Sequence, residues 1–327
     1  MSRLGVVLPY WLDRPDGEAL DIAVEADRAG FDTLWVGEMA TFDAFALATA
    51  IGLRTDRIGL RVGPLAVGVR SPVALALGLS SVAGLTGRRV DLALGASSPA
   101  IVWGWHDRPW GKAAPRMRET VRAVRGILDG GRVDFAGEHV RVTGFRLRNP
   151  LPASSITVAA YGPAMTRVAA EEADEVVLNL VTAEHVAAVR GILDDHAKAV
   201  GRPAPRLAVW LAGALDPGSD AIRQLAAQLT VYLAPPGYGE MFSELGHGEL
   251  VARARAGASR AELLDALPTE LIARVCAIGS AQGVIDRIED YHRAGADHVG
   301  VVPCTAQDPG GRALLTALSA QLKENST

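Results

Sequence analysis

The sequence predicts an α/β protein in which eight parallel strands close into a barrel surrounded by helices, a (β/α)8 TIM barrel with insertions. Two observations predict it: short apolar runs rich in Val, Ile and Leu recur along the chain, and a helical pattern precedes or follows each run. Such alternation is typical of α/β folds, and barrels of this kind exceed the usual domain size. We therefore expect one domain over residues 1–327.

Helix boundaries support the same fold. Ser71 and Pro72 read as a cap followed by a first-turn proline, and Gly87 and Gly130 lie where helices should stop. The segments 28–32 and 293–297 share an Arg-Ala-Gly pattern before a strand, which an open doubly wound sheet also uses, so this echo supports the barrel without deciding it. The expected strands are 4–8, 33–36, 58–67, 90–96, 156–160, 175–180, 207–215 and 298–303.

Two segments depart from the alternation. Residues near 132–142 read as a small β-hairpin outside the barrel, with Ala136 and Gly137 at its turn. Residues near 216–277 read as helical without a strand, interrupted by a Pro- and Gly-rich turn at 235–239. Long insertions at strand ends usually shape a substrate pocket, and we expect this of the second segment.

Composition favours small-molecule partners. The formal net charge is −4, from 33 basic and 37 acidic residues without charge blocks, so there is no footprint for nucleic acid or for an anionic membrane. There is no run of 18 apolar residues and no charged leader followed by a long apolar region. Because Cys276 and Cys304 are far apart without metal-type spacing, we expect neither a disulfide nor a zinc site. We read a cytoplasmic protein.

Several catalytic motifs are absent from the sequence: HExxH, GxSxG, a P-loop, and a GxGxxG after the first strand. Chemistry is therefore expected at the carboxyl ends of the strands, where TIM-barrel enzymes hold their active sites. Glu38 and Asp43 are the only acids near those ends, so no metal site is expected. The helix opened by residues 161–164 can seat an anion on its free N–H groups, although an ordinary turn explains the same residues.

Four segments carry a resemblance to a known family: 35–38 (Trp-Val-Gly-Glu), 63–72, 87–98 and 159–163. Nearly end to end, the chain resembles the luciferase-like monooxygenase superfamily, and it looks like the actinobacterial branch that depends on the deazaflavin coenzyme F420. The resemblance implies an oxidoreductase that transfers a hydride to or from a small organic substrate, as a homodimer. The alternatives are an FMN-dependent two-component monooxygenase supplied by a separate cofactor reductase, and a non-catalytic flavin-binding protein.

The same resemblance assigns cofactor contacts. The third strand tip corresponds to a bulge that often holds a non-prolyl cis peptide behind the cofactor ring, the serines after strand four to residues near the ring or phosphate, and the loop after strand five to a phosphate-binding helix start. The implied contacts are Ala66, Val67, Gly68, Ser97, Ser98, Tyr161, Gly162, Pro163, Ala164 and Met165.

Two residues are candidates for catalysis. Glu38 stands where family members commonly place histidine or aspartate, and it reads either as a general acid or base or as a structural partner of a backbone amide or an arginine. His106 lies beside tryptophans just past strand four, and it reads either as a catalytic group or as a solvated loop histidine. Arg116 and Arg118 read as surface charges, with a phosphate contact left open for Arg116.

Aromatic residues in the loops indicate a partly aromatic substrate pocket, although such residues pack on one another as often as on ligands. They are Trp103, Trp105, Trp110, Tyr232, Tyr238 and Phe242. The remaining histidines have no partners at a useful spacing and read as structural: His139, His185, His196, His247, His292 and His298.

Overall fold

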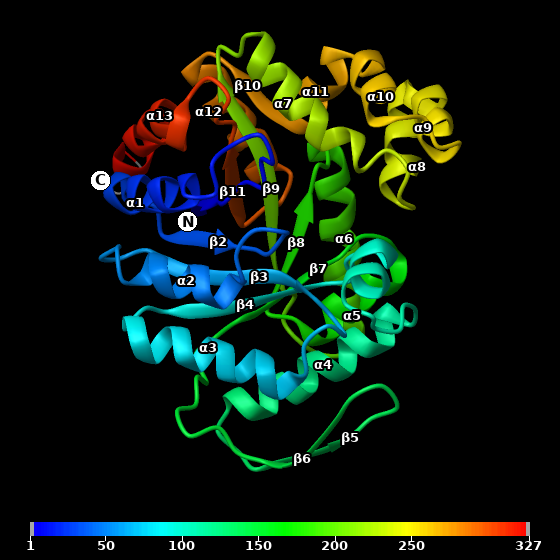
Figure 1. Ribbon diagram of the computed structural model, residues 1–327. Coiled ribbons are helices and arrows are strands. Elements are labelled where there is room, and N and C mark those ends of the chain that lie inside the picture. Colours follow the sequence, from blue (N-terminus) through cyan, green and yellow to red (C-terminus); the bar gives the residue numbers. More distant parts are fainter. Residues whose placement is uncertain (1–2, 325–327) are drawn as a thin grey trace.

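The computed structural model describes residues 3–324, with the backbone alone for 321–324, and it confirms the closed barrel of parallel strands (Figure 1). Each of the eight expected runs overlaps a barrel strand, and β8 pairs with β9 to close the ring. Residues 1–2 and 325–327 of the expected domain lie outside the described residues. The barrel strands are β1 Arg3–Val7, β2 Thr33–Val36, β3 Gly59–Ala66, β4 Val90–Gly95, β7 Ile156–Ala159, β8 Glu175–Asn179, β9 Arg206–Leu215 and β11 His298–Pro303.

Eight helices cover the outside of the barrel, and local sequence sets their ends. Ser71 caps α3 by accepting a hydrogen bond from Ala74 N at 3.2 Å, and Gly87 ends that helix with φ 69°. Gly30 and Gly295, in the repeated Arg-Ala-Gly segments, also have positive φ angles, of 91° and 104°. No described helix is both long enough and apolar enough to span a bilayer. These helices are α1 Glu18–Ala29, α2 Ala44–Gly52, α3 Pro72–Thr86, α4 Ala113–Leu128, α5 Pro163–Glu172, α6 Ala183–Ala199, α12 Ala281–Arg293 and α13 Arg312–Glu324.

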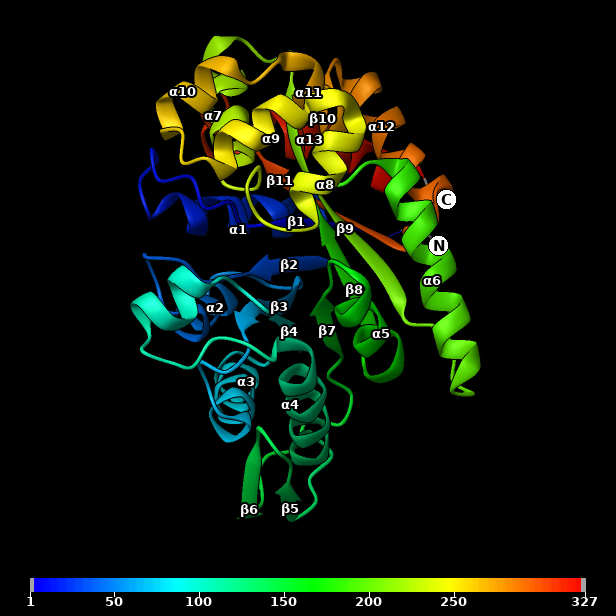
Figure 2. The same cartoon turned by 90° about the vertical axis from the view of Figure 1, so that its right-hand side faces the viewer.

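Two insertions extend the barrel. The expected hairpin forms as the antiparallel pair β5 Val133–Ala136 and β6 Arg141–Phe145 at the end of α4 (Figure 1). The expected helical insertion lies above the carboxyl ends of the strands (Figure 2). It contains α7 Ser219–Thr230, α8 Tyr238–Phe242, the π-helix η2 Ser243–His247, α9 Gly248–Arg255, α10 Arg260–Ala266 and α11 Thr269–Val275. Two short elements complete the chain, the π-helix η1 Ala100–Trp105 and the 3-10 helix η3 Pro309–Gly311.

The prediction of a strand-free segment up to residue 277 is wrong at its end. The insertion closes with β10 Cys276–Gly279, which pairs in parallel with residues 212–215 of β9. β9 has ten residues, and β8 pairs with its first five, so the rest of that edge would otherwise be open. A four-residue strand is too short to be recognised by its periodicity.

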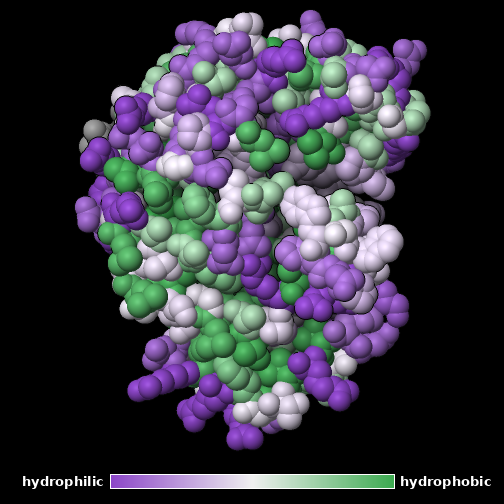
Figure 3. Space-filling model, in the orientation of Figure 1, coloured by the Kyte–Doolittle hydropathy of each residue, from purple (hydrophilic) through white to green (hydrophobic). Residues whose placement is uncertain are grey.

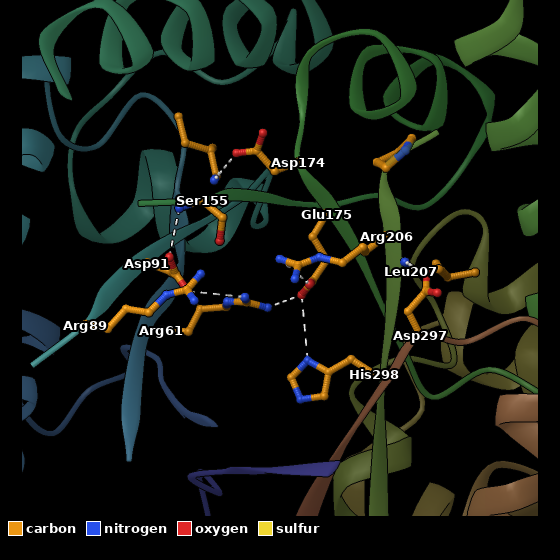
Figure 4. A network of polar contacts seen from close by, with 12 residues as sticks. Arg61, Arg89, Asp91, Ser155, Asp174, Glu175, Arg206, Leu207, Asp297 and His298 are labelled. Atoms are coloured by element: carbon orange, nitrogen blue, oxygen red, sulfur yellow. Dashed lines mark hydrogen bonds and ion pairs between the residues drawn. The ribbon is translucent and has the colours of Figure 1, made fainter. Parts of the chain in front are cut away.

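A buried group of charges closes the amino end of the barrel, and we call its five residues the barrel-floor cluster (Figure 4). Arg61 of β3 pairs with Glu175 of β8 and lies 3.5 Å from Asp91 of β4. Arg206 and His298 approach the Glu175 carboxylate to 3.2 and 3.8 Å. Burial alone would raise the pKa of Glu175, but the hydrogen bond with His298 and the charge of Arg61 lower it to about 2. The cluster therefore neutralises its own buried charges.

Two indole rings fill the barrel between this cluster and the carboxyl ends of the strands. Trp35 and Trp210 meet edge to face with 5.3 Å between ring centroids, and the guanidinium of Arg61 lies 4.6 Å from the Trp35 ring. Gly300 makes room for them, because a Cβ there would lie 2.8 Å from Val7 and 3.2 Å from Trp210. The barrel is thus a packed core that is open at one end, the mouth.

Candidate active site

The mouth is the end of the barrel seen in Figure 2, where the carboxyl ends of the strands meet. The insertion borders it above, α5 and α6 border it on the right, and α4 borders it below (Figure 2). Three non-glycine residues with positive φ lie within two residues of the ends of β4, β8 and β9, namely Ser97, Leu180 and Asp216. Because strained backbone clusters at functional sites, their position indicates that this end holds the site.

Glu38, at the tip of β2, is held by three donors. Arg70 donates to its two oxygens at 2.8 and 2.7 Å, and Ala44 N donates to Oε2 at 3.0 Å. Arg70 also donates to Asp43 at 2.7 Å. Burial would raise the pKa of Asp43, but hydrogen bonds from Ala46 N and Arg70 hold it below its usual value. Both structural partners considered for Glu38, an amide and an arginine, are therefore present.

The tip of β3 differs from the expected bulge. The register with β4 shifts between Val62 and Leu65, and the one cis peptide bond among residues 3–324 joins Gly63 to Pro64. The expectation of a non-prolyl cis bond at 66–68 is therefore wrong. In this chain a proline occupies the irregular position. The tertiary amide before a proline prefers the trans form less strongly than an ordinary peptide bond does. Val67 N instead donates to Gly95 O at 2.8 Å, which joins this tip to that of β4.

Arg116 reaches the β3 tip from the first turn of α4. A Cβ added at Gly68 would lie 3.0 Å from both Cδ and Nη1 of Arg116, so the guanidinium stem lies against that glycine. Its Nε is buried without a hydrogen-bond partner, and no described residue forms an ion pair with it. By contrast, Arg118 pairs with Glu171 and Glu172 of α5. Arg116 is thus a partnerless cation beside the mouth, as a site for an anion requires.

The start of α5 supplies a second anion-binding feature. Gly162 has φ 82° and ψ 158°, and no side chain caps the helix. The loop residues Gly162, Pro163 and Ala164 are exposed, whereas Met165 is buried. Since an uncapped helix start presents free N–H groups and a partial positive charge, this end fits a phosphate.

The residues after β4 form the next part of the rim. Ser97 is left-handed, with φ 63°, and Ser98 Oγ accepts from Ile101 N at 3.4 Å. A Cβ at Gly95 would lie 3.2 Å from Pro64 and 3.7 Å from Ala159. Near their carboxyl ends, β3, β4 and β7 therefore lie in close mutual contact. Small residues there allow a flat group to approach the backbone closely.

Aromatic rings connect the insertion to the barrel. Tyr161, directly after β7, stacks on Tyr238 of α8 at 4.1 Å and on His185 of α6 at 5.3 Å between centroids. Tyr232 meets Tyr238 edge to face at 4.9 Å. Gly237 lets α8 come close, since a Cβ there would lie 2.4 Å from the Tyr161 ring.

Tyr10 extends this row to the tip of β1. Its hydroxyl lies against Gly37, and burial, with smaller contributions from Tyr232 and Glu38, raises the pKa of Tyr10. Tyr232 is hydrogen-bonded to Asn179 at the tip of β8. Burial raises the pKa of every tyrosine in the row, so their hydroxyls stay protonated. We call these residues the tyrosine wall: Tyr10, Tyr161, Tyr232, Tyr238 and the stacked His185.

His106 lies apart from these groups. It follows η1 on an exposed loop and makes no hydrogen bond or ion pair with a described residue through its side chain. Its catalytic role stays a prediction. Among residues 3–324 there is no group of three His, Cys, Asp or Glu side chains that could hold a metal ion.

The sequence indicates that the site lies at the strand ends, but it does not indicate which residues contact one another there. Arg70 and Tyr10 lie in segments that mark strand tips, yet nothing in the sequence shows that Arg70 meets Glu38, which is 32 residues away. His185 was read as structural because no partner lies near it in sequence, but the fold brings it onto Tyr161. A histidine in the first turn of a helix that follows a barrel strand is the signal that could have found it.

Comparison with known proteins fits this geometry. The model of the luciferase-like monooxygenase family matches residues 10–298. A Mycobacterium tuberculosis protein provisionally named a coenzyme F420-dependent oxidoreductase is 31% identical over 186 residues, which span 53% of this chain and 54% of that protein. An F420-dependent glucose-6-phosphate dehydrogenase of Nocardia farcinica is 27% identical over 86% of each chain.

Solved structures share the fold over the whole chain. The coenzyme F420-dependent tetrahydromethanopterin reductase of Methanopyrus kandleri aligns with a TM-score of 0.80 at 18% identity, covering 100% of this chain and 99% of that one. The oxygenating component of 3,6-diketocamphane monooxygenase of Pseudomonas putida, in complex with FMN, aligns with a TM-score of 0.70 at 17% identity, covering 98% and 97%. Because the family model matches most of the sequence and the barrel is that of these structures, the chain belongs to the luciferase-like monooxygenase family.

Proposed function

We propose that this protein is an oxidoreductase that uses coenzyme F420 for hydride transfer to or from a small organic substrate. The observation that carries the proposal is the presence at the mouth of two anion-binding features, Arg116 without a partner and the uncapped start of α5. The relatives of this chain are named F420-dependent enzymes. When bound, a deazaflavin accepts or donates a hydride at its ring.

The residues at the mouth fit such a cofactor in three places. The α5 start, from Gly162 to Met165, and Arg116 would hold its phosphate through N–H groups and positive charge. The small tips of β3 and β4 would accept its flat ring, with Ala66 to Gly68 on one side and the two serines 97 and 98 on the other. The protein thereby positions the ring and excludes water from it.

Glu38 acts in this proposal as a positioning residue. Its oxygens already accept from Arg70 and Ala44, and Arg70 in turn joins Asp43. A proton can instead be held at the hydroxyl of Tyr10, which lies beside these groups and stays protonated because of its burial. His106, on the exposed loop after η1, is the second candidate proton donor.

The site also suits FMN, because the phosphate of FMN would bind at the same place, the α5 start and Arg116. In that case the protein would be the oxygenating half of a two-component monooxygenase served by a separate reductase. The relatives named for F420 favour the deazaflavin. A non-catalytic flavin-binding protein is the third candidate and would bind cofactor without turnover.

Titration of the purified protein with oxidised F420 and, separately, with FMN tests the proposal. We expect micromolar or tighter binding of F420 and weaker binding of FMN. Gly162→Ala should weaken F420 binding, because the left-handed φ of 82° sets the α5 start. Gly201→Ala is the matched control, since Gly201 also has a positive φ and an open environment, but follows α6 at the far end of the barrel. A preference for FMN would support the monooxygenase, and binding of neither would refute both.

We further propose a homodimer formed through α2 and α3. Both helices are rich in apolar residues, and Leu53, Leu77 and Leu85 are exposed on or beside them. Figure 3 shows hydrophobic residues gathered on the surface over α3. Exposed apolar surface of this kind marks protein contacts. Sedimentation should therefore give a dimer for the wild type and a monomer for Leu77→Glu, and a wild-type monomer would contradict the proposal.

A cytoplasmic location and a single domain over 1–327 complete the proposal. Cys276 and Cys304 are both buried as free thiols, which suits a reducing compartment.

A further inference from the structure

We propose that the substrate is a flat, uncharged aromatic compound carrying a carbonyl or hydroxyl group, held between the tyrosine wall and an exposed loop of tryptophans. This inference rests on the proposed function, because it concerns what is bound beside the cofactor.

The tryptophan loop, residues 103–112, is the first observation. All ten residues are exposed, and Trp103, Trp105 and Trp110 expose 68%, 56% and 43% of their surface. Val102, which is 2% exposed, anchors the loop to the protein. Half of the protein's six tryptophans thus lie in eight exposed residues. Large apolar surface left in water at the rim of a site indicates a ligand that covers it.

The loop lies on the mouth. It leaves the tip of β4 and returns to α4 beside Arg116, which lies against Gly68 of the β3 tip. Figure 2 shows its turquoise coil to the left of the mouth, with α8 and α6, which carry part of the tyrosine wall, above and to the right. Within the loop, Asp107 and Lys112 have left-handed backbone conformations. The tryptophan loop and the helices that carry the tyrosine wall therefore border the mouth on different sides.

A small groove supplies the third observation. It runs along the tips of β1 and β2, and Tyr10 belongs both to it and to the tyrosine wall. Its walls include the apolar residues Leu8, Met39 and Phe42 and the charged residues Arg14 and Glu18. The edge of a ring that rests against its apolar side would exchange water contacts for apolar and aromatic ones.

The charges at the mouth argue against an anionic substrate. Arg70 is neutralised by Glu38 and Asp43. Burial lowers the pKa of His185, and the charge of Glu244 acts on both His185 and Tyr161. A phosphate or carboxylate beside the tyrosine wall would be repelled by the charge of Glu244, whereas a neutral ring would not be.

The tyrosine hydroxyls account for the polar group of the substrate. Tyr161 Oη is buried without a partner, and the hydroxyl of Tyr10 makes no described hydrogen bond. Both can donate to a carbonyl or hydroxyl oxygen. A buried donor without a partner favours a ligand that satisfies it.

Equilibrium dialysis of the F420-loaded protein with 9-fluorenone, a flat neutral ketone, tests the inference. Cyclohexanone and glucose 6-phosphate serve as non-aromatic and anionic comparisons. We expect fluorenone to bind at least about tenfold more tightly than either, because each ring contact adds to simple area burial. In Trp103→Ala/Trp105→Ala its Kd should rise at least about tenfold. Ile192→Ala, which truncates a 44% exposed apolar side chain on α6, should leave that Kd unchanged.

F420 binding is measured in parallel by the coenzyme's own fluorescence, which separates the two proposals. The substrate inference is overturned, and the proposed function stands, if F420 binds equally to all three proteins while the Kd for fluorenone is the same with and without the tryptophans. The same holds if glucose 6-phosphate binds more tightly than fluorenone. If F420 does not bind to the wild type, the proposed function fails and this inference fails with it.

Discussion

Replacement of Arg116 with methionine tests the phosphate seat directly. Methionine keeps the length of the stem that lies against Gly68 and removes the guanidinium. A hydrogen bond to a charged group contributes about 1.5–3 kcal/mol, so the Kd for F420 should rise about 10- to 100-fold. Stability should not fall, because Arg116 Nε is buried without a partner and its loss removes an unsatisfied donor.

The assay is fluorescence titration of F420 at two salt concentrations, with thermal unfolding as the check on the fold. Arg118→Met is the matched control, since Arg118 lies two residues along the same helix but pairs with Glu171 and Glu172. The control should leave the Kd within about twofold of the wild type, because its charge is already neutralised by its partners. Equal Kd values for the wild type and Arg116→Met would refute the assignment of the seat.

Three other substitutions have defined outcomes. Glu38→Gln should lower stability by about 1–2 kcal/mol through its hydrogen-bonded partners, and leave the pH profile of kcat/KM unchanged. Glu175→Gln should destabilise by about 3–5 kcal/mol at pH 7. The variant should also lose less stability than the wild type as the pH falls from 4.5 to about 2. In the wild type the depressed pKa of Glu175 stabilises the fold above this pH range, and that contribution is lost as the pH falls through it. Gly237→Ala should loosen the insertion by a clash with Tyr161, whereas Gly246→Ala, with a similar φ and open space, should not.

Each of these outcomes has a clear opposite. Loss of an ionisation from the kcat/KM profile of Glu38→Gln would make Glu38 the acid or base after all. Urea unfolding of Glu175→Gln with the wild-type pH dependence would show that another group carries the acid sensitivity. Proteolysis of the insertion at equal rates in the two glycine variants would show that α8 does not depend on close contact with Tyr161.

The sequence allowed the barrel to be predicted because its signals are local. Strands buried on both faces form continuous apolar runs, and the helix ends at Ser71 and Gly87 depend on residues next to them. β10 escaped because it is four residues long and has a neighbour only in three dimensions. The β3 tip was misread because the irregularity lies at Gly63 and Pro64, before the segment that the resemblance marked.

The site was predictable in place but not in pairing. Residues after strands were expected at the mouth, since parallel strands end together. Which charges cancel there depends on contacts across the fold, such as that between Arg70 and Glu38, which are 32 residues apart in the sequence. The free charge at Arg116 follows only from the absence of an acid near it among the described residues.

The two ends of the barrel differ in whether their polar groups have partners. At the amino end, Arg61 and Glu175 come from strands 114 residues apart and neutralise each other, so loss of either leaves a buried charge and costs stability. At the mouth, Arg116 and the hydroxyl of Tyr161 are left without partners, and loss of either costs the fold little. Because the packed layer of Trp35 and Trp210 separates the ends, substitutions at one should add to those at the other without coupling. Arg116→Met should therefore weaken F420 binding by the same factor in the Glu175→Gln background as in the wild type, and a different factor would show that the floor of the barrel helps to shape the seat.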